Sequence, residues 1–66
     1  MKTIAISLKT EEGKLVQDVD LNKLIFVLSK LENNENLEFE NEKQIYNLLD
    51  KYDLLNEEFL IDINNL

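Results

Sequence analysis

The chain has 66 residues, and its 14 acidic residues against seven lysines give a formal net charge of −7. It contains no Cys, His, Trp, Pro or Arg. These absences exclude a disulfide framework and the usual zinc, haem and iron–sulfur sites. A chain of this length has room for one core, so we expect a single domain over residues 1–66.

The sequence predicts a cytoplasmic protein with no membrane partner. Its longest apolar run covers only residues 24–28, far short of the roughly 18 residues of a membrane helix. The apolar residues near the N-terminus alternate with others, whereas a signal peptide has an unbroken apolar stretch. All basic residues are lysines and nine residues are Asn, as is typical of an AT-rich genome such as that of a low-GC bacterium or its phage. For a phage protein the compartment is the cytoplasm of the host.

A β-hairpin is predicted at the N-terminus. Ile4, Ile6 and Leu8 alternate with small or polar residues, which is the period of a half-buried strand. Residues 10–14 contain the only glycine, Gly13, and form the loop. Residues 15–19 are the expected return strand.

A first helix is predicted over residues 21–32, with Asp20 as its N-cap. At 100° per residue its apolar side chains form one stripe: Leu21, Leu24, Ile25, Leu28 and Leu31. Phe26 falls on the opposite, polar face. It is an apolar anchor for a partner or for a second copy of the chain, or a stray surface aromatic, or it covers another element, unless the helix phase differs from the one assumed.

The rest of the chain alternates between strand-like and helical patterns. After a turn at residues 33–36, Leu37 and Phe39 alternate with acidic residues and predict a short strand over 37–40. Asn41 and Gln44 have the spacing of a capping box, which predicts a second helix to about residue 52. Residues 59–63 alternate again and predict a final strand, although residues 56–58 are also suited to capping a short third helix.

Together these elements predict an α+β fold. A small mixed or antiparallel sheet, made of the N-terminal β-hairpin, the short middle strand and the C-terminal strand, packs against two helices. This order resembles the opening of a β-grasp, ubiquitin-like sheet, as a topological analogy. The expected core contains Ile4, Ile6, Leu8, Leu24, Ile25, Leu28, Leu31, Ile45, Leu49, Ile61 and Ile63.

The sequence indicates no catalytic, cofactor-binding or metal-binding residues, and we expect no cofactor and no enzyme activity. There is neither His nor Cys for acid–base or nucleophilic work. Asp18, Asp20 and Asn22 have the spacing of an EF-hand loop, but its sixth position is Lys23 and its twelfth is Ser29 instead of Gly and Glu. A helix cap at Asp20 explains these residues better. The excess of acids also argues against direct nucleic-acid binding.

The charge is unevenly distributed along the chain. Residues 1–30 have four acidic residues and five lysines, a net charge of +1, whereas residues 31–66 have ten acidic residues and two lysines, a net charge of −8. In a strand over 37–40, neighbouring carboxylates on one face lie about 6.6 Å apart and form a ridge. The candidate partner-binding residues are Phe26, Glu35, Glu38, Glu40, Glu42, Asp50, Asp53, Glu57 and Glu58.

These features predict a small acidic, non-enzymatic binding protein. In size, charge and lack of catalytic residues, the chain is similar to small phage-encoded proteins that inhibit host enzymes or defence nucleases, some by mimicking nucleic acid. The resemblance implies an inhibitor or modulator that occupies a basic, nucleic-acid-binding surface of a host protein. Two alternatives remain open: a self-associating structural or accessory protein, which includes a homodimer, and an antitoxin-like partner of a basic toxin. In the first of these alternatives the acidic surface serves solubility alone.

Overall fold

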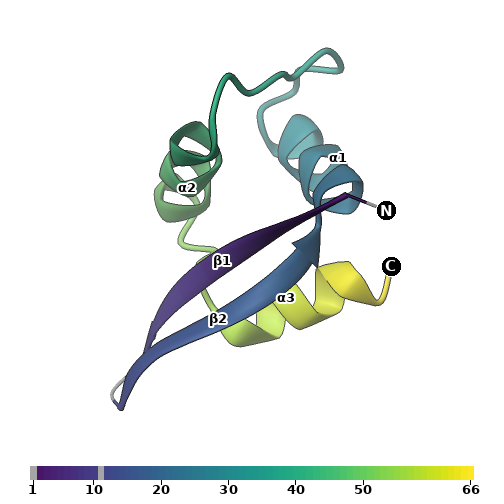
Figure 1. Ribbon diagram of the computed structural model, residues 1–66. Helices are drawn as coiled ribbons and strands as arrows, with labels where there is room; N and C mark the ends of the chain where they lie inside the picture. Colours follow the sequence, from purple (N-terminus) through teal and green to yellow (C-terminus); the bar gives the residue numbers. More distant parts are fainter. Residues whose placement is uncertain (1, 11) are drawn as a thin grey trace.

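The computed structural model describes residues 2–10 and 12–66; Glu11, in the predicted hairpin loop, lies outside the described residues. Two antiparallel strands, β1 (Thr3–Thr10) and β2 (Gly13–Asp20), are followed by three helices, α1 (Leu21–Leu31), α2 (Glu42–Lys51) and α3 (Glu57–Asn64). The strands form a two-stranded sheet that lies across the helices, and the hairpin tip extends beyond them (Figure 1). The α+β class and the antiparallel sheet with packed helices are confirmed.

The register of the hairpin determines which face of the sheet is buried. Ile4 is opposite Val19, and Leu8 is opposite Leu15. Ile4, Leu8 and Val19 are buried, and Leu15 packs against the core. Because side chains alternate along a strand, one face of the sheet covers the core and the other is open.

The helix starts follow the capping rules. The side chain of Asp20 accepts a hydrogen bond from the Lys23 backbone N–H, 3.1 Å away, which confirms Asp20 as the cap of α1. Asn41 does the same for Gln44 N–H at 3.2 Å, and the Gln44 side chain accepts from the Glu40 N–H at 2.9 Å. These bonds confirm the predicted start of α2, although the Gln44 side chain binds the N–H of Glu40 and not that of Asn41, the partner in a capping box.

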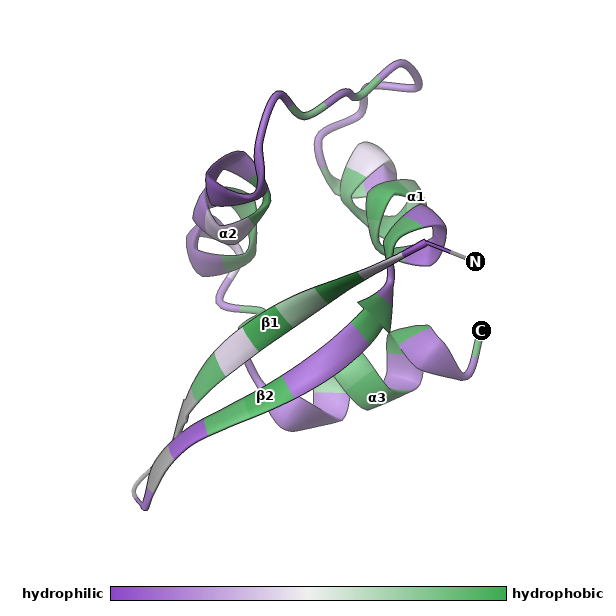
Figure 2. Cartoon of the chain, viewed as in Figure 1, coloured by the Kyte–Doolittle hydropathy of each residue, from purple (hydrophilic) through white to green (hydrophobic). Residues whose placement is uncertain are grey.

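The core lies between the sheet and the inward faces of all three helices. Its buried residues are Ile4, Ile6, Leu8, Val19, Leu24, Leu28, Ile45, Leu49, Leu60 and Ile63. Figure 2 shows the hydrophobic side of α2 turned toward α1, with hydrophilic residues on its outer side. Three residues of the expected core are less buried: Ile25 is half-buried, Leu31 is 45% exposed and Ile61 is 42% exposed.

The predicted strand over residues 59–63 is wrong, and the alternative of a third helix is right. Asn56 caps α3, since its side chain accepts from Phe59 N–H at 2.8 Å. A helix places Leu60 and Ile63 on one face and turns Ile61 outward, whereas a strand would have buried Ile61 together with Ile63. The alternation in this segment was short enough to fit both periods.

The predicted strand over residues 37–40 is also wrong, because this segment lies in the connection between α1 and α2 without pairing to another strand. The described sheet therefore has two strands instead of four. No later strand of the described chain returns beside β1, so the β-grasp analogy does not hold beyond the hairpin and the helix that follows it.

Candidate partner-binding surface

Phe26 is on the outward face of α1, where 55% of its surface is exposed, as the helical stripe predicted. The Lys30 Nζ atom lies 4.4 Å from the centre of the Phe26 ring, a cation–π contact. A surface hollow beside the ring is lined by Phe26, Ser29, Lys30, Asn33, Asn34 and Glu35. The structure therefore brings Phe26 together with Glu35, another of the predicted partner-binding residues.

The central part of the predicted carboxylate ridge lies in the connection between α1 and α2. Glu38 and Glu40 are exposed, while Leu37 and Phe39, which alternate with them, are half-buried against the core. Figure 1 shows this connection at the opposite end of the molecule from the hairpin tip. The carboxylates thus face outward as the sequence predicted, although the backbone that presents them is a loop.

Glu42, Glu57 and Glu58 occupy the first turns of α2 and α3 and are exposed. The first backbone N–H groups of a helix have no partner within it, and they form the positive end of the helix dipole. Carboxylates at these positions stabilise the helix. Each of the three therefore has a structural role, whether or not it also contacts a partner.

Asp50 and Asp53 lie together at the end of α2. Asp50 belongs to the last helical turn, and Asp53 follows the helix with a φ of 56°, a conformation that Asp tolerates better than most residues. Both line a hollow that also includes Ser7, Lys14, Tyr46 and Leu55. The predicted binding residues are thus divided among separate places: this hollow, the hollow beside Phe26, the loop and the helix starts.

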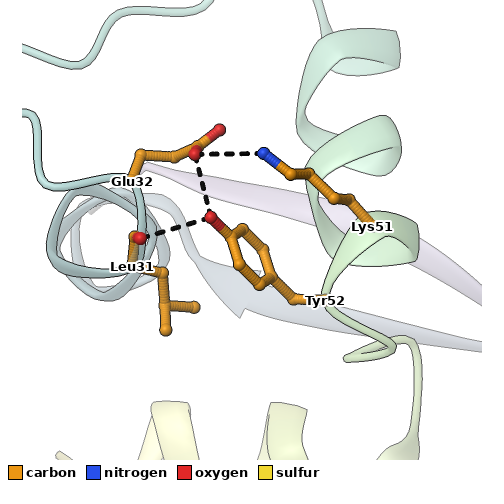
Figure 3. Close-up of polar contacts among 4 residues, drawn as sticks. All are labelled: Leu31, Glu32, Lys51 and Tyr52. Atoms are coloured by element: carbon orange, nitrogen blue, oxygen red, sulfur yellow. Dashed lines mark hydrogen bonds and ion pairs between the residues drawn. The ribbon is translucent and has the colours of Figure 1, made fainter.

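A small polar network joins the ends of α1 and α2 (Figure 3). The Tyr52 hydroxyl donates to Glu32 Oε2 at 2.8 Å, and Lys51 Nζ lies 3.3 Å from the same oxygen. The hydrogen bond from Tyr52, followed by the hydrogen bond and the charge of Lys51, holds the pKa of Glu32 below its ordinary value of 4.5. The same contacts with Glu32 raise the pKa of both Tyr52 and Lys51. Lys51 is exposed, and Glu32 and Tyr52 are half-buried; together the three side chains link the end of α1 to the end of α2.

Two side chains that the sequence did not single out for this purpose bind the outer edges of the sheet. The Tyr46 hydroxyl accepts from Ser7 N–H at 2.9 Å and donates to Ala5 C=O at 3.2 Å, on the free edge of β1. On the free edge of β2, the Asn64 side chain accepts from Asp20 N–H at 3.1 Å and donates to Asp18 C=O at 3.0 Å. We call these contacts the two edge clamps.

The sequence around Tyr46 and Asn64 does not predict that their side chains bind the edges of the sheet. The backbone groups that the Tyr46 hydroxyl binds are about forty residues away from it in the chain. Asn64 is one of nine Asn residues and follows a segment whose type the sequence left open. No local pattern distinguishes an Asn that pairs with a distant strand from one that faces water.

Within residues 2–10 and 12–66, the structure contains no group of three or more acidic side chains placed to hold a metal ion, and none of its helices is long and apolar enough to cross a membrane. Comparison of the chain with models of protein families, with curated proteins and with solved structures found no match.

Proposed function

We propose that this protein is a small acidic binding protein that occupies a basic, nucleic-acid-binding surface of another protein, as a phage-type inhibitor or modulator of its host would. The proposal depends most on one observation: of the ten acidic residues in 31–66, nine have exposed side chains, Glu32 being the exception. Among the described residues, the one ion pair is that between Lys51 and Glu32. The remaining carboxylates are therefore available to a basic partner.

Repulsion among the exposed carboxylates of residues 31–66 supports a role for them in binding a partner of opposite charge. Carboxylates of like charge repel one another, and this repulsion destabilises the compact state. A partner of opposite charge removes the repulsion, and the summed field of both surfaces accelerates their encounter. Basic surfaces of this kind occur mainly on proteins that bind nucleic acid, where an acidic protein competes with phosphate groups.

The hollow beside Phe26 adds an apolar contact to this surface. Interfaces depend on a few well-buried anchors, among which aromatic residues are frequent. Phe26 is exposed on a polar helix face, and Glu35 lines the same hollow. A partner with a basic side chain next to an apolar one would contact both. We therefore assign to Phe26 the role of anchor and to the carboxylates that of steering.

The charge is tested by replacing Glu35, Glu38, Glu40 and Glu42 with Gln, which removes four charges and keeps the shape. A partner captured from host lysate is used to measure association rates at about 50 and 300 mM salt, between which the Debye length falls from about 14 to 6 Å. We expect slower association and a smaller salt dependence for the variant. Double-stranded DNA added to the partner should compete with the wild-type protein.

A second variant replaces Asp50, Asp53, Glu57 and Glu58, the other candidate partner-binding carboxylates, with their amides, an equal change in charge elsewhere on the molecule. If both variants associate as fast as the wild type, with the same salt dependence, the acidic residues serve solubility and the proposal is wrong. Binding that DNA does not displace would favour the antitoxin-like alternative, in which the target is a basic protein that does not bind nucleic acid.

The role of Phe26 is tested by Phe26→Ala. We expect this variant to dissociate faster from the partner while its free energy of unfolding stays within about 0.5 kcal/mol of the wild type, because the exposed ring loses little packing. A loss of about 3 kcal/mol or more would show that Phe26 belongs to the core. Unchanged dissociation with unchanged stability would remove Phe26 from the interface.

A further inference from the structure

The two edge clamps leave one stretch of sheet edge open. The Leu21 N–H donates to Lys2 C=O at 3.0 Å, which identifies the residue pairs that exchange hydrogen bonds within the hairpin. Alternate residues therefore direct their N–H and C=O groups outward. On β2 these residues are Lys14, Val16, Asp18 and Asp20. The Asn64 side chain binds the C=O of Asp18 and the N–H of Asp20, so this clamp does not extend beyond Asp18 toward the hairpin loop.

The open stretch lies toward the hairpin tip, which extends beyond the helices in Figure 1. Val16 is at its centre and is 61% exposed. Lys14 and Asp18 are also exposed, and neither belongs to the one ion pair found among the described residues. An open strand edge with an apolar residue at its centre is a template for pairing with another strand.

The order of the side chains specifies the partner. In an antiparallel pair of two β2 strands centred on Val16, each Val16 is opposite the Val16 of the second copy. Lys14 of one copy is then opposite Asp18 of the other, twice by symmetry. Opposite charges in this cross-strand position attract, whereas a parallel pair would place like charges opposite each other. The segment is thus complementary to itself in the antiparallel orientation.

We propose that β2 pairs with β2 of a second copy of this chain, around a two-fold axis at Val16, to give a four-stranded sheet in the order β1-β2-β2-β1. The Val16 N–H and C=O groups exchange two hydrogen bonds across the axis. The Asp18 N–H donates to Lys14 C=O of the other copy, also twice. The Asn64 clamp stays closed in both copies. It binds the C=O of Asp18, whereas the pairing uses the N–H of Asp18.

This interface contains none of the candidate partner-binding carboxylates, although Lys14 also lines the hollow of Asp50 and Asp53. It lies in the half of the chain with a net charge of +1, so repulsion between the two copies is weakest there. The paired segment is short, and short strand pairs give weak association. We therefore expect dimers at protein concentrations from about 10 µM to 1 mM, measured by sedimentation equilibrium.

Charge exchange tests the register. Lys14→Asp places two carboxylates opposite each other, and Asp18→Lys places two ammonium groups opposite each other. Each change should raise the dimer dissociation constant about tenfold. The double variant restores opposite charges and should return the constant to the wild-type value. The single variants change the net charge in opposite directions, so an effect of net charge alone would move their dissociation constants in opposite directions.

Amide hydrogen exchange locates the contact. The Val16 amide should become more protected as the protein concentration rises, while the Ala5 amide on the outer edge of β1 should not change. Circular dichroism of the variants checks that they fold. A wild-type protein that stays monomeric at about 1 mM, or a folded double variant that fails to recover dimerisation, would refute the proposal.

Discussion

Residues 1–30, which contain the hairpin and nearly all of α1, differ from residues 31–66 in their charge and in the partners of their backbone hydrogen bonds. Residues 1–30 have nearly balanced charge, and residues 31–66 contain ten of the 14 acidic residues. The strands depend on each other and on Tyr46 and Asn64 for their hydrogen bonds, whereas α2 and α3 satisfy theirs internally. A strand needs a partner edge, and a helix does not.

This need for a partner edge explains why residues 37–40 and residues 59–63 do not form strands, although both segments alternate like strands. Both edges of the sheet are partly occupied by side chains that arrive from α2 and α3. A strand paired along the whole length of either edge would have to displace these clamps. Residues 37–40 therefore remain an unpaired connection, and residues 59–63 lie within a helix.

The largest expected loss of stability comes from a substitution in α3, and it tests which residues of this helix face the core. Leu60 is fully buried, so Leu60→Ala should lower the free energy of unfolding by about 2–5 kcal/mol. Its neighbour Ile61 is 42% exposed, and Ile61→Ala should cost less than about 1 kcal/mol. Urea unfolding of both variants measures the difference. The opposite order would mean that the segment is a strand with Ile61 inside.

The edge clamps should have a smaller effect on stability. Tyr46→Phe removes one hydroxyl and Asn64→Ala one amide, and each should cost about 1 kcal/mol because water replaces the lost partners at an exposed edge. Hydrogen exchange is the sharper measurement. The Ser7 amide should exchange faster in Tyr46→Phe, and the Asp20 amide in Asn64→Ala. The Val19 amide, bonded within the hairpin, serves as the control in both variants.

The smallest expected effect is a change in how the stability of the fold depends on pH. Because Glu32 has a lower pKa in the folded protein than its ordinary 4.5, its contribution to stability is complete above pH 4.5 and is lost as the pH falls through the folded pKa. Tyr52 and Lys51 have raised pKa values, so their contributions are complete below the ordinary pKa of each and are lost as the pH rises through its folded pKa.

Glu32→Gln should therefore unfold at a melting temperature that depends less on pH than that of the wild type between about pH 5 and pH 3. Glu35→Gln is the matched control, since Glu35 is an exposed carboxylate outside the network. Equal acid sensitivity in the wild type and Glu32→Gln would show that the contacts drawn in Figure 3 do not persist in solution.

Much of the architecture was determined locally. The alternation of Ile4, Ile6 and Leu8 was sufficient to predict β1 and its buried face, and the side chains of Asp20 and Asn41 marked the starts of α1 and α2. The outward position of Phe26 followed from the helical period alone. These features depend on residues within one turn or one strand of each other, which a sequence displays directly.

The tertiary structure decided what depends on distant residues. Whether residues 59–63 form a strand or a helix depended on distant partners, because a strand needs a sheet edge to pair with and Asn64 binds part of the β2 edge. Asn56 favoured the helix with one capping bond. The use of Tyr46 and Asn64 as clamps, and the hollow that joins Phe26 to Glu35, arise only when separate elements pack together. A short alternating segment is compatible with both periods, so its structure is set by the partners available to its backbone hydrogen bonds.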